Sequence, residues 1–312
     1  MKKINIGFIG NFIPSFSTEN ERKKAFEELG HTVICFQENQ TKSIDLLEAM
    51  PNLDMLIYSH THDPSYVIKD LKKVFVIFKA NNIPTMSAHL DRWLWLNREK
   101  DMGHEATWFT EYIFMADCSP EAIEKYDELG LNWHYLPPAV AKDQCYITEP
   151  DYNRFPHKII FTGSKGYHPE YPYRSQMIDF LARTYGDKFG HYGNDGIRVV
   201  REKDLNVLYA SSKIVIGDSC FGGRINYISD RLTEVTGRGG FIITPSIETL
   251  KIPSIATYDH PNLQDLKEKI DYYLINQEER EKTKEEVYQY VKKNHTYTNR
   301  AEQIINVVFK NQ

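Results

Sequence analysis

Short apolar runs alternate with helix-length segments along the whole of this 312-residue chain. An apolar run bounded by glycine or proline predicts a buried strand, and strands separated by helices predict a parallel sheet with helices on both faces. The runs lie at residues 3–10, 31–36, 54–59, 84–88 and 112–116, and again at 158–163, 213–217, 241–244 and 255–258. The predicted fold class is therefore α/β, with two doubly wound domains that face each other across a cleft.

The predicted boundary between the two domains lies near a stiff double proline, Pro137-Pro138, which cannot continue a helix. A polar, proline-containing stretch follows at residues 141–156 and is typical of a linker. We therefore place the first domain at residues 1–145, the second at residues 146–290, and a final helical segment at residues 291–312.

The composition argues against several classes of protein. Hydrophobic residues make up 41% and charged residues 26%, as in ordinary globular proteins, and there is no apolar run of membrane-spanning length. The four cysteines are scattered without a CxxC pair, which fits a reducing cytoplasm and argues against a zinc site or a disulfide framework. The pair His60 and His62 lacks a third ligand, so no metal is expected.

The charge is unevenly distributed along the chain. The net charge is −5, yet acidic residues outnumber basic ones only in the first 140 residues, and the rest is close to neutral. A relatively basic second half suits an anionic ligand, and an acidic first half argues against a broad duplex-DNA surface there. Lys69, Lys72, Lys73 and Lys79 have helical spacing and could line a local basic groove; the alternative is a solvated helix face.

The segment from Ser229 to Thr244 carries the densest pattern in the chain. It predicts a short helix with Ser229 as its N-cap, then a glycine turn and a buried strand. A helix N-terminus with a basic residue such as Arg231 suits a phosphate, and Glu234 could accept both hydroxyls of a sugar diol. By spacing, Arg231, Glu234 and Arg238 are predicted to share one helix face. The segment could thus hold the diphosphate and ribose of a nucleotide; the alternative is a surface helix with an ordinary Arg–Glu pair.

A second candidate for anion binding follows the predicted strand at 158–163. Gly163, Ser164 and Lys165 form a small loop in which backbone N–H groups could cradle a phosphate and the lysine could neutralise it. Asp218 follows another predicted strand and should lie at the same ligand-facing edge of the sheet. The alternative for the loop is an ordinary strand–turn–helix connection.

In the first domain, an unusual loop follows the strand at 84–88. It holds His89, Asp91, Arg92 and Trp93, and we predict acceptor recognition there, with Asp91 or His89 as a general base. The alternative is that tryptophans cover the sheet edge and Asp91 pairs with Arg92. Two further residues at strand ends, Gly10 and His60, are expected to face the cleft.

The motifs also carry a family resemblance, strongest over residues 155–305. The segment Ser229-Asp230-Arg231-(x2)-Glu234-(x2)-Gly237-Arg238-Gly239-Gly240-Phe241 resembles the core motif of the glycosyltransferase family that includes the spore-maturation CgeB-like proteins and many bacterial and bacteriophage relatives. His295-Thr296-Tyr297-(x2)-Arg300-Ala301 looks like its C-terminal signature, and Leu136-Pro137-Pro138 resembles its interdomain junction. The chain thus resembles a GT-B glycosyltransferase of the CgeB-like, group 1 type.

This resemblance implies two Rossmann-like domains, with a C-terminal helix that crosses back to the first domain. It implies a nucleotide-diphosphate-sugar donor, in the first place a UDP-sugar, in the second domain, with Arg231 at the diphosphate and Glu234 at the ribose. The remaining donor-binding positions would be Gly163, Ser164, Lys165, Tyr192, Asp218, Asp230, Gly239 and Gly240. It implies no bound metal or cofactor, because the helix dipole and basic side chains can stabilise the departing diphosphate. Tyr227 stands where retaining members often carry a second glutamate, so stereochemistry stays open.

The predicted function is transfer of a sugar to an acceptor hydroxyl on a modified DNA base, a protein or a surface glycan. Two alternatives use the same fold. A sugar-nucleotide epimerase or hydrolase would draw on His60, His62 and His89, and a non-catalytic protein would only bind a nucleotide or glycan. We expect a cytoplasmic protein of a bacterium or a phage-infected cell, and a homodimer is one assembly the sequence leaves open.

Overall fold

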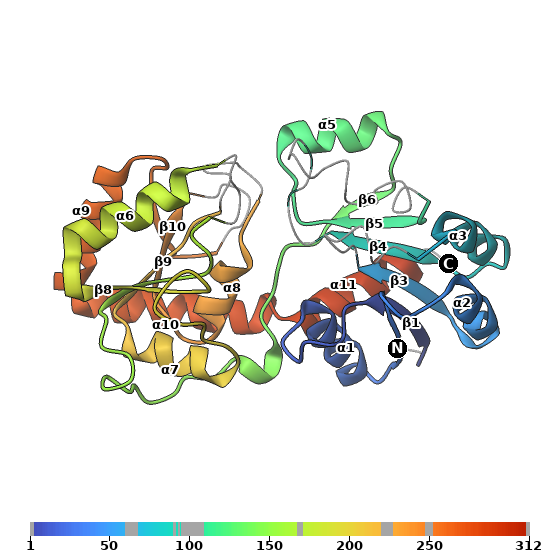
Figure 1. Cartoon of the computed structure of the whole chain (residues 1–312), viewed down its shortest axis with the longest axis horizontal. Helices are drawn as coiled ribbons and strands as arrows, with labels where there is room; N and C mark the ends of the chain where they lie inside the picture. Colours follow the sequence, from blue (N-terminus) through green and yellow to red (C-terminus); the bar gives the residue numbers. More distant parts are fainter. Residues whose placement is uncertain are drawn as a thin grey trace. The chain divides into compact units, whose positions relative to one another are not determined.

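The computed structural model describes residues 3–59, 68–89, 92, 94, 109–166, 171–219, 227–246 and 252–309. The chain divides into two compact units, one formed by Met1–Pro137 with Tyr297–Gln312 and the other by Pro138–Thr296. Each unit is a parallel sheet accompanied by helices (Figure 1), so the α/β fold class is confirmed. The linker predicted at residues 141–156 belongs to the second unit.

The first unit is built on a six-stranded parallel sheet with the order β2-β1-β3-β4-β5-β6. Its strands are β1 (Asn5–Gly10), β2 (Thr32–Gln37), β3 (Met55–Ser59), β4 (Thr85–His89), β5 (Tyr112–Met115) and β6 (Trp133–Tyr135). Every residue of β3 and β4 is buried, as expected when helices cover both faces of a sheet. The strand order reverses between β1 and β3, which is the topological switch point where such sheets bind ligands.

The helices of the first unit include one from the far end of the chain. They are α1 (Thr18–Glu28), α2 (Ser43–Ala49), α3 (Leu71–Ala80), α5 (Pro120–Glu128) and α11 (Tyr297–Phe309), with a 3₁₀ turn η1 (Met50–Asn52). Apolar side chains of α2 and α3, such as Leu46 and Phe75, form one cluster with strand residues such as Leu56. The helix α11 packs against α1, and Arg300 Nε donates to the carbonyl of Pro137 at 2.8 Å. The last helix therefore returns to the first unit.

Three features of the first unit are not indicated by its sequence pattern. The helix α3 begins at Leu71, because Asp70 just before it has a left-handed backbone (φ 58°) that an α-helix cannot include. The helix α2 was not predicted, since seven residues are too few to show a periodicity. The strand β6 was not predicted either, because its three residues are only partly buried and form no apolar run.

The second unit is built on a five-stranded parallel sheet with the order β11-β10-β9-β7-β8. Its strands are β7 (Ile159–Thr162), β8 (Phe189–Tyr192), β9 (Ile214–Ile216), β10 (Ile242–Pro245) and β11 (Ala256–Tyr258). The order reverses between β7 and β9. The switch point of this sheet is therefore formed by the residues that follow these two strands.

Helices cover both faces of this second sheet. They are α6 (Tyr173–Tyr185), α7 (Lys203–Ser211), α8 (Asp230–Gly237), α9 (Leu263–Ile275) and α10 (Gln277–Asn294), with 3₁₀ turns η4 (Lys142–Gln144) and η5 (Gly186–Lys188). Side chains of α6 and α9 pack with Phe161 on one face, and those of α7 and α8 pack with Val215 on the other. The helix α10 packs on α8. No helix within the described ranges combines the length and the apolar character that a bilayer crossing needs.

Gly7 lies in the centre of β1, where the core leaves no room for a side chain. A Cβ atom there would lie 2.7 Å from Leu53 Cδ1 and 3.1 Å from Leu56 Cδ1. We expect Gly7→Ala to lower the free energy of unfolding by about 1–3 kcal/mol, because overpacking forces neighbouring side chains from their rotamers. Urea denaturation measures this. Gly166→Ala is the matched control, since nothing lies within 4 Å of its Cβ position; equal effects of the two substitutions would contradict the packing argument.

Candidate functional site

Arg231 lies at the switch point of the second unit, in the first turn of α8. Its backbone N–H donates to Asp230 Oδ1 at 2.7 Å. Its guanidinium donates to two carbonyls, that of Thr162 at the end of β7 (2.6 Å from Nε) and that of Asp218 after β9 (2.9 Å from Nη1). It also lies over the ring of Phe161, with Cζ 4.4 Å from the centroid. One buried side chain therefore joins the ends of two neighbouring strands.

The predicted phosphate loop passes directly over this guanidinium. Gly163 has φ +126°, a conformation that other residues rarely adopt, and a Cβ atom on it would lie 2.6 Å from Arg231 Nη2. A glycine is therefore required at this position, because a side chain would collide with the guanidinium of Arg231. Ser164 comes next, and its carbonyl accepts a bond from Arg174 Nη1 at 3.2 Å.

Arg174 is a residue of this site that the sequence analysis missed. It lies in the first turn of α6 and is buried, and its Nε donates to Asp218 Oδ2 at 2.6 Å. An ion pair this deeply buried is costly to break, because the remaining partner keeps its charge without compensation. The sequence did contain a signal for Arg174: it is a basic residue at the start of the helix that follows the Gly163 loop. The loop and this helix belong to one strand–loop–helix unit.

The carboxylate of Asp218 lies among aromatic side chains as well as arginine. It interacts electrostatically with Tyr173, Tyr258 and His260. The two tyrosine hydroxyls are 3.2 Å apart, and the Tyr173 ring meets the His260 ring edge-on at 4.0 Å. Burial lowers the pKa of His260, so its imidazole stays neutral near pH 7. Asp218 therefore occupies a low-dielectric wall of the switch point and is not a solvated surface acid.

Lys165 is the third residue of the predicted phosphate loop. Its backbone N–H donates to both carboxylate oxygens of Asp195, at 3.1 and 2.9 Å, and its amine pairs with Asp179. The amine that was expected at a phosphate is thus engaged by a carboxylate of α6 in this structure.

Glu234 lies one turn beyond Arg231 and pairs with Arg238, Oε2 to Nε, at 2.8 Å. Arg238 also donates to the carbonyl of Glu202 at 2.9 Å and to Asn206 Oδ1 at 2.6 Å. The face predicted for Arg231, Glu234 and Arg238 is therefore divided, because Arg231 turns to the strand ends, whereas Arg238 contacts α7 and Glu234 pairs with Arg238. A carboxylate has about four acceptor positions, so it can accept from more than one donor at a time.

Of three further predicted donor residues, Tyr192 lies beside the loop, since its carbonyl accepts from the Gly163 N–H at 2.9 Å, but its side chain turns into the core, and two glycines lie away from the switch point. The Tyr192 hydroxyl is 2.8 Å from His157 Nδ1, and its ring lies in the core against Phe155. Gly239 and Gly240 precede β10, at the edge of the sheet opposite to the switch point. The contacts that they permit are with protein, since Cβ atoms there would lie 2.7 Å from Ile147 Cγ1 and 2.7 Å from Val235 Cγ1, respectively.

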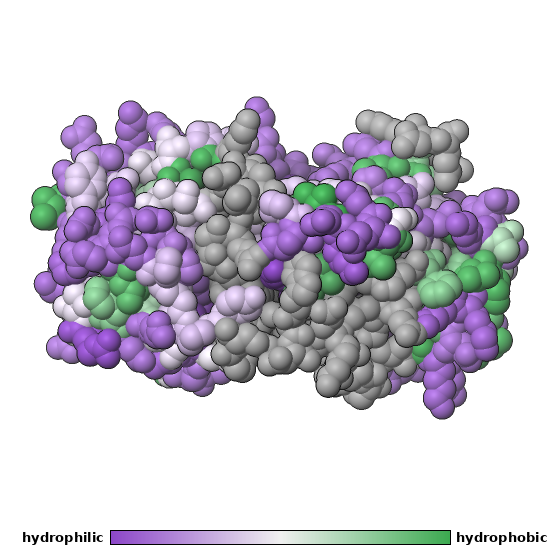
Figure 2. Space-filling view, turned by 90° about the horizontal axis from the view of Figure 1, so that it is seen from above, coloured by the Kyte–Doolittle hydropathy of each residue, from purple (hydrophilic) through white to green (hydrophobic). Residues whose placement is uncertain are grey.

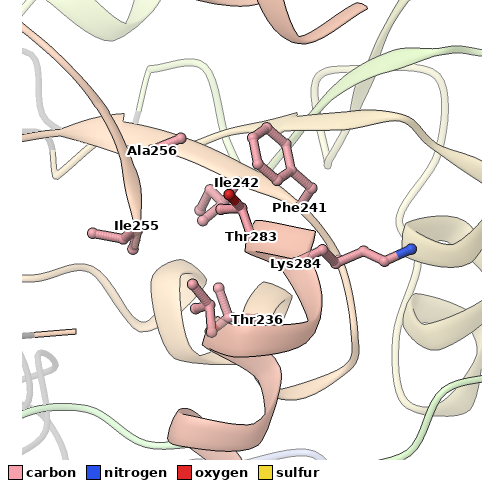
Figure 3. Close-up of a pocket in the computed structure, with 9 residues that line it drawn as sticks. Thr236, Phe241, Ile242, Ile255, Ala256, Thr283 and Lys284 are labelled. Carbon is pink, nitrogen blue, oxygen red and sulfur yellow. The ribbon is translucent and has the colours of Figure 1, made fainter. Parts of the chain in front are cut away.

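A small cavity lies at that same opposite edge (Figure 3). It is lined by Thr236, Gly240, Phe241, Ile242, Ile255, Ala256, Thr283, Lys284 and Val287. Its volume of ≈ 10 Å³ is about that needed for one water molecule. It is a packing feature between the sheet and α10, too small for a nucleotide.

In the first unit, the switch point brings together Gly10, Glu19 and Ser59. Ser59 Oγ donates to Glu19 Oε1 at 2.9 Å, and a Cβ atom on Gly10 would lie 2.6 Å from Glu19 Cγ. Gly10 thus lets the first turn of α1 approach the end of β1. The arrangement offers a carboxylate and a hydroxyl, which are groups that bind hydroxyl-bearing ligands.

The predicted acceptor loop is only partly described. His89 ends β4 and is buried, with 3% of its surface exposed. Arg92 is also buried, and it lies 3.6 Å from both Asp117 Oδ2 and Glu121 Oε1. Asp91, Trp93 and His60 lie outside the described residues. Among the residues that are described, no cluster of three or more His, Cys, Asp or Glu side chains could hold a metal ion.

Comparisons with known proteins agree with the architecture. Residues 174–306 match the model of a family described as "Glycosyl transferase-like". That range contains Arg174, Asp218 and the whole Ser229–Gly240 segment. No curated protein matches the sequence at a significant level.

Solved structures with similar folds span nearly the whole chain. An "alpha-glucosyltransferase in complex with UDP-glucose and DNA containing an abasic site" has a TM-score of 0.69 at 12% identity, covering 98% of this chain and 100% of that one. Anabaena Alr3699/HepE in complex with UDP and glucose has a TM-score of 0.66 at 11% identity, covering 98% and 100%. Sucrose-phosphate synthase from Thermosynechococcus elongatus has a TM-score of 0.63 at 10% identity, covering 99% of both chains.

The family match and the fold together support glycosyltransferase function, and the resemblance inferred from the motifs is confirmed at this level. The chain has the α/β fold of the GT-B glycosyltransferases, and its residues 174–306 match the glycosyl transferase-like family model.

Proposed function

We propose that this glycosyltransferase transfers a hexose from a UDP-sugar to an acceptor hydroxyl, with the donor held by the second unit. The observation that carries the proposal is the pair of arginines, Arg174 and Arg231, at the switch point beside Gly163. Open α/β sheets bind nucleotides at this place, and guanidinium groups suit phosphate oxygens. UDP is the first choice of nucleotide because similar folds were solved with UDP or UDP-glucose.

The same groups would assist departure of the diphosphate. Negative charge grows on the leaving group as the bond to the sugar breaks, and fixed positive groups that face it lower the barrier. Arg231 is held rigidly by two backbone carbonyls, so little reorganisation would be needed. The N-terminus of α8 adds its dipole. We propose that this chemistry needs no bound metal.

We assign the acceptor to the first unit, where Gly10, Glu19 and Ser59 form a polar switch point. Asp91 or His89 remains our proposed general base, with Arg92, Trp93 and His60 as acceptor-side residues. DNA, a protein and a glycan are the candidate acceptors, and DNA is favoured by the alpha-glucosyltransferase of similar fold, which was solved with DNA.

A thermal-shift series tests the donor. A ligand that binds only the folded state stabilises it, by about 2.7 kcal/mol at a hundredfold excess over Kd. We expect UDP and UDP-sugars to raise Tm clearly, and GDP, ADP, CMP and dTDP to raise it less. A uniform absence of shifts would contradict the donor assignment. Incubation with donor alone separates transfer from hydrolysis or epimerisation by its products.

Glu234 is proposed to hold the ribose hydroxyls. We expect Glu234→Ala to weaken UDP binding about 10- to 100-fold, because two hydroxyls lose a charged acceptor. Isothermal titration calorimetry measures this.

Glu234→Gln separates binding from structure, because it keeps an acceptor for Arg238 while removing the charge. The control is Glu128→Ala, which removes an exposed glutamate of the first unit. UDP affinity that stays the same in Glu234→Ala would refute the ribose assignment and leave Glu234 as the structural partner of Arg238.

A further inference from the structure

The helix α3 exposes an apolar stripe that the proposed chemistry does not use. Val76 is 53% exposed and Ile77 38%, and Phe109 beside them is 45% exposed. Together with Lys72 and Lys73 they line a hollow of ≈ 450 Å³ whose exposed lining is apolar. Figure 2 shows apolar surface at the right of the view, on the side where Figure 1 places α3. Single exposed apolar residues are ordinary, whereas these three lie together around one hollow, which suits contact with an apolar partner.

Lysines surround this apolar stripe. Residues 69–80 contain four lysines, at 69, 72, 73 and 79, against one aspartate, Asp70. The amine of Lys72 lies over the Phe109 ring, 5.5 Å from its centroid, and that of Lys73, whose side chain is 77% exposed, pairs with Asp70 at 2.9 Å. The first 140 residues are acidic overall, so this is a local concentration of positive charge against the trend of its own unit.

The two faces of α3 are clearly separated. Leu71, Val74, Phe75 and Phe78 are buried in the core against the sheet. The outward residues of the helix are Lys72, Lys73, Val76, Ile77, Lys79 and Ala80, so lysines precede and follow the two adjacent exposed residues Val76 and Ile77. Lysine stems can lie along apolar surface while their amines reach outward, which is the pattern of a helix that lies at a membrane interface.

We propose that the face formed by Lys69, Lys72, Lys73, Val76, Ile77, Lys79 and Phe109, here called the α3 face, docks on an anionic lipid surface. Its charge is complementary to acidic headgroups, and its apolar centre suits the boundary between headgroups and acyl chains. Duplex DNA fits the lysines but not the centre, because protein–DNA interfaces are strongly polar and offer no counterpart for Val76 and Ile77. Such docking would place the enzyme at a membrane, and it does not depend on which acceptor is used.

Vesicle co-sedimentation with the purified full-length protein tests the proposal. We expect binding to vesicles that contain phosphatidylglycerol, little binding to pure phosphatidylcholine, and weaker binding as salt rises. Lys72→Gln with Lys73→Gln should reduce binding by about fivefold for each charge removed. Val76→Ser with Ile77→Ser should also reduce it, because less apolar surface enters the interface.

The matched control combines Ile275→Ser with Lys282→Gln in the second unit. Ile275 is 81% exposed and the Lys282 side chain is 75% exposed, so the same chemical change is made away from α3. This variant should bind vesicles like the wild type. All substituted side chains are at least partly exposed, and thermal melting checks that each variant is folded.

Three results would overturn the proposal. The first is a wild-type protein that does not bind anionic vesicles. The second is binding to duplex DNA that depends on Lys72 and Lys73, with vesicle binding unchanged in the Val76/Ile77 variant, which would make the face a nucleic-acid surface. The third is a dimer that dissociates in the Val76/Ile77 variant while vesicle binding is unaffected, which would assign the face to a second copy of the chain.

Discussion

The second unit depends on one buried guanidinium. Arg231 reaches back from the first turn of α8 to the carbonyls of Thr162 and Asp218, and so joins the ends of β7 and β9. Removing a charge from water is unfavourable unless hydrogen bonds replace those to solvent, and the two carbonyls with the face of Phe161 provide this replacement. The loop above it can close only because Gly163 has no side chain. The buried pair of Arg174 and Asp218 then fixes the start of α6 to the same place.

The two sheets share a strand pattern but differ in the chemistry at their switch points. In the second unit, the guanidinium groups of Arg174 and Arg231 lie at the carboxyl ends of β7 and β9, where positive charge suits a phosphate-bearing donor. In the first unit, Glu19 and Ser59 occupy the equivalent place between β1 and β3, and they offer hydrogen-bonding oxygens without basic charge. This difference agrees with the proposed division, in which one unit binds an anion and the other binds hydroxyl groups.

The proposed lipid surface would lie on a different part of the first unit from its switch point. The α3 face is carried by a helix that covers the sheet, whereas Gly10 and Ser59 lie at the strand ends. Binding to a membrane through a helix layer leaves the strand ends available for chemistry. The opposite side of the same helix is anchored in the core, because Phe75 and Phe78 are fully buried.

The sequence by itself determined the architecture. Apolar runs separated by helices specify parallel sheets, and Ser229, Arg231 and the Gly163 loop were recognisable because each signal lies within a few neighbouring residues. The pair of Glu234 and Arg238 was also accessible, since residues four apart on a helix are neighbours.

Only the tertiary structure decided which partners these groups take. Arg174 meets Asp218 across 44 residues, and Arg231 meets Thr162 across 69, distances at which local spacing carries no information. The same holds for Gly239 and Gly240, which look like a ligand-binding turn but make room for Ile147 and Val235. Local periodicity determines where the helices and strands form. Long-range packing decides which side chains are buried, paired or exposed to a ligand, because burial depends on which distant segments of the chain pack against them.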